Sequence, residues 1–418
     1  MVGMNCSAAR AACLSSLGGI QVVLSAFANT TQVLKDLSDL LAQHQLASVC
    51  TVTANPGAQA TIVQARLNAE AMNTWAPGHD TLGLHQRLPP SGLNADKALM
   101  QEILVALLAS PAGLAFPSVA ALASHIRVRR HIAQAAQKTA LAFKTEAAER
   151  PQNYWRDGGD EAGFILQPGR CLVDALIAAT QPDATGKLYD FSCYRATEYV
   201  ILLGIAQELK THHPELLAQL QSLNEVHAVR SGQFHEVYLV EYGSMETPLP
   251  ARFYVPGDRL WFRNPDERSS DVTGYEGSWV IYMGGGLFSN FWQRDRPYTL
   301  ASKAIEIFHW KDGVYTDAQG ELQMDESVVE AHVAQTLSDP QVTAQVLERM
   351  LRMRDPKGVY AQGGCIDTTR EYHRNVSRDQ CELVLPSFDI TPDSGHLIGQ
   401  GVGWQAVDFG QQLRQRAA

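Results

Sequence analysis

Basic residues are in the minority in this 418-residue chain, which has 34 lysines and arginines against 44 aspartates and glutamates and a formal net charge of −10. No basic block is present that could follow a phosphate backbone, so nucleic acid is not an expected partner and anionic membrane surfaces are disfavoured. Cysteines are also few, odd in number and irregularly spaced, seven in all. This usage is typical of a reducing compartment and does not indicate a disulfide framework.

Long apolar runs are missing as well. No window reaches the roughly 18 uninterrupted apolar residues that a membrane span needs. The N-terminal region has a single positive charge, Arg10, and no compact apolar segment with a clear cleavage site, so we expect no classical signal peptide. These absences predict a soluble protein that is made in the cytoplasm, and they leave export by a specialised secretion route open.

The chain is longer than one typical domain, and its hydrophobic pattern changes twice. Residues 1–110 are rich in alanine and leucine at helical spacing and predict a helical N-terminal extension. After Pro214 the period changes from about 3.6 to 2, and residues 237–242, 259–263 and 278–283 predict strands. Helices followed by strands indicate an α+β core over 111–315, and residues 316–418 are interpreted as a C-terminal addition.

The segment 188–210 is the most informative part of the chain. A polar cluster that includes Asp190 and Ser192 precedes a long apolar run that ends before Pro214, which predicts a buried helix with Cys193 in its first turn. Backbone N–H groups and the helix dipole favour the thiolate there, and a thiolate attacks carbonyl carbon. The alternative is that Cys193 is only a small buried hydrophobe.

Metal and phosphate sites are not predicted. Cys365, His373 and Cys381 are separated by intervals of eight residues, which lack the close ligand pairs of a zinc site. The glycines at 284–286 follow a predicted strand without the helix and lysine of a phosphate cradle, so they predict a hairpin turn.

Four motifs occur in order: Asn-Tyr-Trp-Arg at 153–156, Tyr-Asp-Phe-Ser-Cys at 189–193, Pro-Gly-Asp-Arg-Leu-Trp-Phe-Arg-Asn-Pro at 256–265, and Tyr-Glu-Gly-Ser-Trp-Val-Ile-Tyr-Met-Gly at 275–284. Together they resemble the bacterial, Bacillus-type protein-glutamine gamma-glutamyltransferases, the transglutaminase family, over roughly residues 116–310.

The resemblance implies a papain-like core of the cell-wall peptidase type and acyl transfer through a Cys193 thioester, from a protein glutamine to a lysine amine. It implies protein substrates and no calcium, other metal or organic cofactor. Aromatic side chains at Trp155, Trp261, Tyr275 and Trp279 could wall a channel that excludes water from the thioester. Ordinary packing in the sheet core is the alternative for these four residues.

Three acid/base positions differ from the family pattern. The family has a glutamate immediately before its cysteine, and this chain has Ser192 there. At the position of the family's second glutamate this chain has Ser278, and the histidine expected after the glycine turn is replaced near 290–291. In an extended segment, residues 276 and 278 share a face and lie roughly 7 Å apart. Glu276 is therefore a provisional acid/base for Cys193, and the alternative is an exposed glutamate. The serines could orient water or an amide.

The sequence thus favours a transglutaminase-like cysteine acyltransferase with altered acid/base positions. Two alternatives stay open: a glutamine deamidase or peptide amidase on the same core, in which water resolves the acyl-enzyme, and a degenerate relative that keeps the fold for binding. The protein substrate and the oligomeric state are left open.

Overall fold

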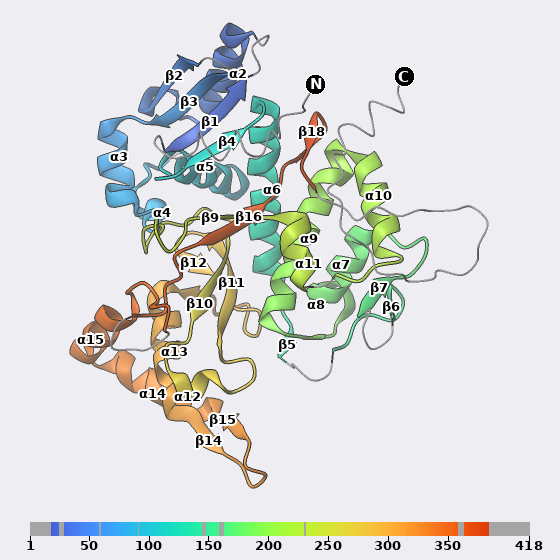
Figure 1. Ribbon diagram of the computed structural model, residues 1–418, viewed down its shortest axis with the longest axis vertical. Helices are drawn as coiled ribbons and strands as arrows, with labels where there is room; N and C mark the ends of the chain where they lie inside the picture. The colour runs from blue at the N-terminus through green and yellow to red at the C-terminus, as the bar shows by residue number, and fades with distance from the viewer. Residues whose placement is uncertain are drawn as a thin grey trace.

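The computed structural model describes residues 18–24, 29–57, 60–90, 92–143, 148–158, 163–229, 231–357 and 363–383 (Figure 1). The last part of the predicted C-terminal addition, from residue 384 onward, lies outside the described residues. None of the helices in the described ranges combines the length and hydrophobicity needed to cross a membrane.

The N-terminal unit is built on a four-stranded sheet with the order β2-β3-β1-β4, drawn in blue and cyan in Figure 1. Strand β1 pairs antiparallel with β3 and parallel with β4. The prediction of a purely helical extension was wrong, because β1 and β3 hold β-branched runs that a helical reading overlooked. The elements of the unit are β1 (Gly19–Leu24), α2 (Thr30–Gln43), β2 (Cys50–Pro56), β3 (Thr61–Leu67), α3 (Ala69–Trp75), α4 (Leu84–Arg87), α5 (Ala95–Leu108) and β4 (Gly113–Phe116).

Two long helices, α6 (Val119–Lys138) and α9 (Cys193–His212), pack against each other in the middle of the molecule. Helix α9 was predicted from the apolar run that follows Ser192, and α7 (Leu172–Thr180) packs beside it. The apolar side chains of α6 and α9 form one buried cluster with those of α7. Smaller elements surround them: β5 (Ala142–Phe143), β6 (Trp155–Asp157), β7 (Phe164–Leu166), α8 (Pro182–Thr185), β8 (Asp190–Phe191), α10 (Pro214–Asn224) and α11 (Ser231–Tyr238).

A six-stranded sheet with the order β13-β12-β11-β10-β16-β9 supports the centre of the protein. Neighbouring strands are antiparallel. Along β11, Ile281 and Met283 face the cluster that contains α9, while Val280 and Tyr282 face the cluster that contains α13, as the two-residue period of a strand requires. The strands are β9 (Leu239–Tyr242), β10 (Arg259–Arg263), β11 (Gly277–Gly284), β12 (Leu287–Phe288), β13 (Tyr298–Thr299) and β16 (Arg370–His373).

The strands at 259–263 and 278–283 are confirmed, and the glycines at 284–286 form the turn between β11 and β12. The strand predicted at 237–242 is only half right, because its first two residues end α11 and β9 begins at Leu239.

The predicted boundary at residue 316 does not fit the sheet. Strand β16 comes from the supposed C-terminal addition, yet it pairs with both β10 and β9 and so lies inside the sheet. The helices before it, α13 to α15, are drawn in orange below and to the left of the sheet in Figure 1. This part contains α12 (Glu267–Ser270), α13 (Leu300–Gly313), β14 (Val314–Thr316), β15 (Leu322–Met324), α14 (Glu326–Ser338), α15 (Pro340–Met350), β17 (Val376–Ser377) and β18 (Gln380–Cys381).

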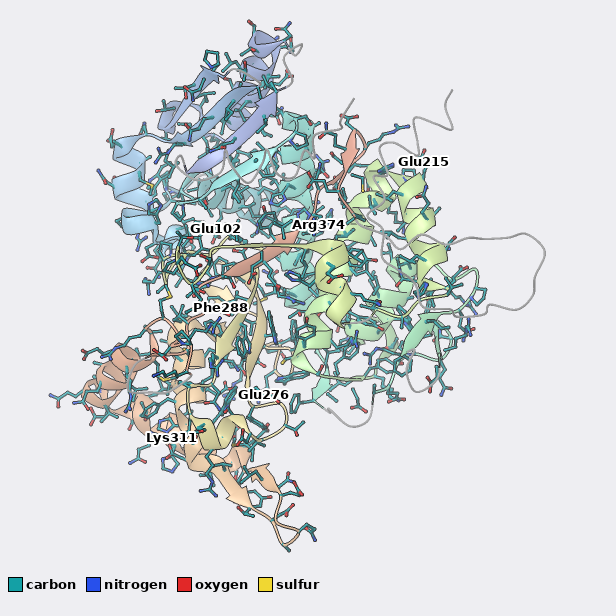
Figure 2. All side chains as sticks on the ribbon, viewed as in Figure 1. Glu102, Glu215, Glu276, Phe288, Lys311 and Arg374 are labelled. Atoms are coloured by element: carbon teal, nitrogen blue, oxygen red, sulfur yellow. The ribbon has the colours of Figure 1, made fainter. Side chains whose placement is uncertain are left out.

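Buried charges connect these layers. The Arg129 guanidinium on α6 lies 2.8 Å from the Asp258 carboxylate, and both side chains are fully buried. At the end of β11, Glu102 from α5, labelled in Figure 2, accepts the Gly285 N–H at 2.9 Å and the Tyr282 hydroxyl at 3.2 Å. The N-terminal unit is thereby bonded to the turn that follows β11.

Candidate active site

Cys193 is the first residue of α9 and is neither fully buried nor fully exposed. The helix begins there because the Ser192 hydroxyl caps it, accepting the Arg195 N–H at 3.3 Å as an N-cap serine does. The position was predicted correctly. Ser192 was also predicted as an orienting group, and its hydroxyl acts here as the helix cap.

Several groups influence the ionisation of Cys193. Burial raises the pKa of its thiol, and the negative charge of Glu276 adds to this rise. The backbone N–H groups of Trp279 and Tyr194 and the positive charge of Lys303 act in the opposite direction. The net effect is a raised pKa of the Cys193 thiol. From the sequence we expected the helix N-terminus to favour the thiolate, but desolvation outweighs that effect.

Strands β10 and β11 carry aromatic side chains beside the cysteine. Trp261 and Trp279 are opposite each other in the two strands, with nearly parallel rings whose centroids are 6.0 Å apart. The edge of the Tyr194 ring meets the Trp279 ring at 5.1 Å. The rings of Tyr194 and Trp279 therefore form an aromatic wall. The backbone N–H groups of the same two residues form hydrogen bonds to the Cys193 sulfur.

Gly277 is required by this packing. A Cβ atom at this position would lie 2.1 Å from Trp261 Nε1 and 2.5 Å from the Phe262 carbonyl oxygen. The indole of Trp261 can cover the start of β11 only because the residue there has no side chain.

Arg259 packs against both rings of the aromatic wall. Its buried guanidinium carbon is 4.7 Å from the Tyr194 ring centroid and 4.5 Å from that of Trp279, which is within cation–π range. Arg259 Nε donates to Glu371 on β16, and the other oxygen of Glu371 is 2.7 Å from His235 Nδ1. This bond raises the pKa of His235 and lowers that of Glu371.

Glu276 lies immediately before β11 and is exposed (Figure 2). Its carboxylate accepts the Gly274 N–H at 3.3 Å, yet its charge still acts on the Cys193 thiol. Ser278 is buried in β11, opposite Phe262. We predicted that residues 276 and 278 lie on one strand. Only Ser278 does, because the strand begins at Gly277.

Helix α13 carries Lys303, whose positive charge acts on Cys193. The sequence gave no reason to predict this residue. Lys303 is buried, with its Nζ 2.8 Å from Glu306 Oε1 and 4.0 Å from the centre of the Tyr298 ring. Glu306 and Tyr298 raise the pKa of this ammonium in spite of its burial. Lys303 is therefore a stable positive charge near Cys193.

The remaining predicted aromatic residues have separate surroundings. Tyr275 is partly buried, donates its hydroxyl to Glu326 Oε1 at 2.7 Å and meets the Trp310 ring edge-on at 5.2 Å. Trp155 is 2 % exposed, lies in the core and donates its indole N–H to the Ala175 carbonyl at 3.0 Å. Its placement fits the core-packing alternative and not a channel wall.

Asn290 is one of the two residues around which the family resemblance led us to expect a histidine. It is buried, its side-chain oxygen accepts the Trp292 and Gln293 N–H groups, and its amide donates to the Arg296 carbonyl. Asn290 thus shapes the loop after β12 and cannot act as an acid or base.

The comparison with protein families shows which family the chain belongs to. The model of the protein-glutamine gamma-glutamyltransferase family matches residues 85–372, which is 288 of the 418 residues. The chain belongs to the protein-glutamine gamma-glutamyltransferase family. The match extends beyond the resemblance expected over 116–310 and includes α5 and the first three residues of β16.

Other comparisons add little to the family assignment. A solved structure, the transglutaminase from Geobacillus stearothermophilus without its C-terminal extension, is 21% identical over 52% of this chain and 98% of its own, with a TM-score of 0.36. A TM-score of this size is too low to establish a shared fold. No curated protein matches the chain.

Arg259 and Lys303 are the two charges near this transglutaminase-family site that the sequence analysis missed. Arg259 lies within the quoted motif, two residues before Trp261 and so on the same face of a strand, and this unexplained arginine was an available signal. Lys303 lies in an ordinary helical pattern that contains no signal of its own.

Proposed function

We propose that the protein is a protein-glutamine gamma-glutamyltransferase that forms its thioester on Cys193. The observation that carries the proposal is the environment of one sulfur atom, which lies at the start of α9, is served by the Trp279 and Tyr194 N–H groups, and is influenced by the charges of Lys303 and Glu276. A cysteine nucleophile uses groups of these kinds: N–H donors and a cation that offset part of the cost of a buried thiolate, and a carboxylate as proton acceptor.

In the proposed reaction the Cys193 proton passes to Glu276 and the sulfur attacks the side-chain carboxamide carbon of a protein glutamine. The carbon–nitrogen bond breaks, and ammonia leaves with the proton that Glu276 returns. A lysine amine then attacks the thioester, the carbon–sulfur bond breaks, and the released proton restores the thiol. The product is an isopeptide crosslink.

The raised pKa of Cys193 suits this cycle in one respect. A neutral thiol is stable in the resting protein, and ionisation is then coupled to substrate binding and to proton transfer. Lys303 and the two backbone N–H groups would offset part of the cost of forming the thiolate at that moment. We further propose that α9 packed on the six-stranded sheet is the papain-like core that the family resemblance implies.

The test is incorporation of a fluorescent primary amine into a glutamine-containing protein. We expect incorporation by the wild type and none by Cys193→Ala. If Glu276 is the acid/base, Glu276→Gln should lower kcat by about 10²- to 10⁴-fold. Glu267→Gln is the matched control, because Glu267 is an exposed glutamate on the neighbouring helix α12 and should retain wild-type activity.

Two other outcomes would replace the proposal. Release of ammonia without amine incorporation, lost in Cys193→Ala, would identify a glutamine deamidase in which water resolves the thioester. Neither ammonia nor incorporation, together with an unmodified Cys193 after prolonged alkylation of the native protein, would identify a binding protein.

A further inference from the structure

A cluster of three potential metal ligands lies between helices α13 and α14, away from the groups assigned to Cys193. It consists of His309, Asp312 and His332, whose ligand-type atoms all lie within 4.8 Å of one another. Among the residues that the structure describes, this is the one group of three or more histidine, cysteine, aspartate or glutamate side chains gathered in this way. The cysteines and histidine considered from sequence, Cys365, His373 and Cys381, do not form such a group.

The spacing of the ligands follows from the helices. His309 and Asp312 are three residues apart on α13, so both project from one face of that helix. His332 comes from the middle of α14, and its ring lies nearly parallel to that of His309 with centroids 5.5 Å apart. Helix α13 thus supplies two of the ligands and α14 supplies the third.

His309 is oriented in the way that metal-binding histidines are. Its Nε2 is 2.7 Å from the Thr336 hydroxyl, and its Nδ1 is 2.7 Å from Asp312 Oδ2. Both His309 and Thr336 are buried, so the ring is fixed at both nitrogens. A histidine that binds a metal usually donates its other ring N–H to an oxygen, and Thr336 provides that oxygen while Nδ1 faces the cluster.

We propose that His309, Asp312 and His332 bind one divalent transition-metal ion, with zinc as the best match. Two imidazole nitrogens and one carboxylate oxygen suit zinc and disfavour calcium and magnesium, which prefer oxygen ligands. With bonds of about 2.0–2.1 Å, ligand atoms around a tetrahedral zinc ion are roughly 3.3 Å apart. The three ligand atoms, which all lie within 4.8 Å of one another, would have to approach by at most about 1.5 Å to reach that spacing.

The exposure of the cluster decides what kind of site this is. Asp312 is exposed while His309 is buried, so the fourth position faces solvent and accepts water or an exogenous ligand. The ion would hold α14 against α13. Helix α13 carries Lys303, whose charge acts on Cys193, and α14 carries Glu326, the hydrogen-bond partner of Tyr275. The site would therefore stabilise the helices that hold these two side chains. The proposal does not depend on the chemistry of Cys193.

The experiment is a zinc titration of the chelator-treated, full-length protein by calorimetry. We expect one equivalent to bind, at least tenfold weaker binding in His332→Gln and Asp312→Asn, and a 10- to 100-fold loss in Thr336→Val, which removes only the oxygen that orients His309. His212→Gln is the control, because His212 is a half-exposed histidine outside the cluster, and it should bind zinc as the wild type does.

Cobalt(II) provides a second measurement. Bound to the wild type, cobalt should show the visible absorption of a tetrahedral nitrogen and oxygen site without the near-ultraviolet band of a cobalt–thiolate bond. Zinc should also raise the melting temperature of the wild type and of His212→Gln, and leave that of His332→Gln unchanged. Equal affinity in the wild type and His332→Gln, or a thiolate band in the cobalt spectrum, would overturn the proposal. Circular dichroism of each apo variant checks that the comparison is between folded proteins.

Discussion

The buried ion pair between α6 and the sheet offers the sharpest test of how this fold is stabilised. Arg129 and Asp258 are both fully buried, and their nearest charged atoms are 2.8 Å apart. Asp258 also accepts the Tyr242 hydroxyl at 2.7 Å and the Val255 N–H at 2.8 Å. The Asp258→Asn substitution keeps the size and one acceptor oxygen but removes the negative charge, so it leaves the Arg129 guanidinium buried without its counter-ion.

The expected loss is large. Removing one partner of a buried pair costs about 3–5 kcal/mol in free energy of unfolding, a change of roughly 10²- to 10⁴-fold in the unfolding constant. The other acceptors of Arg129 Nη1, the carbonyls of Val255 and Pro256 at 3.4 and 3.3 Å, are too distant to replace a carboxylate. A second substitution, Arg129→Met, removes the orphaned charge, and the double variant should recover about 1–3 kcal/mol relative to Asp258→Asn alone.

Urea unfolding followed by circular dichroism and tryptophan fluorescence measures all four corners of this double-mutant cycle. Glu348→Gln is the surface control, because its partner Arg352 is 4.0 Å away and the two side chains are 79% and 50% exposed, so the loss should stay below about 1 kcal/mol. If the two single substitutions are simply additive, or if Asp258→Asn unfolds at the same urea concentration as the control, the pair does not stabilise the fold in the way described.

Three further predictions concern the candidate site. Gly277→Ala should lose about 1–3 kcal/mol of stability by overpacking, because its new Cβ meets Trp261; an unchanged melting temperature would contradict this. Alkylation of Cys193, followed by peptide mass spectrometry, should still accelerate above pH ~8.5, the ordinary thiol pKa, because burial raises its pKa; a plateau below that pH would refute the assignment. Glu371 raises the pKa of His235, so the pair stabilises fully below pH ~6.5, the ordinary histidine pKa, and this stabilisation is lost as pH rises through the raised value. The gap in unfolding free energy between wild type and His235→Gln should therefore shrink from acidic to alkaline pH, and a gap that stays constant or widens would show that the ion pair is not its source.

Local patterns predicted the element that presents the cysteine. Ser192 and the apolar run behind it are enough to start a helix at Cys193, because a cap and a run of good helix formers act within a few residues of each other. The strand period likewise predicted β10 and β11, whereas the position of Trp261 opposite Trp279 came from the strand pairing.

Pairing between distant segments could not be predicted in the same way. Strand β16 lies in the sheet between β9 and β10, although it comes more than a hundred residues later in the chain. A strand of four residues has no sequence feature that predicts which strands it pairs with. The N-terminal sheet was missed for a related reason, since its short strands β1 and β3 are separated by a helix and read as parts of an alanine- and leucine-rich region.

The sequence by itself determined the family and the position of Cys193 at the start of a buried helix. The tertiary structure alone decided which charges act on the sulfur, because Lys303 and the Trp279 N–H reach it from a different helix and a different strand. Desolvation has the same origin, since the burial that raises the pKa of this thiol is produced by the surrounding packed elements and cannot be read from the residues next to Cys193 in the chain.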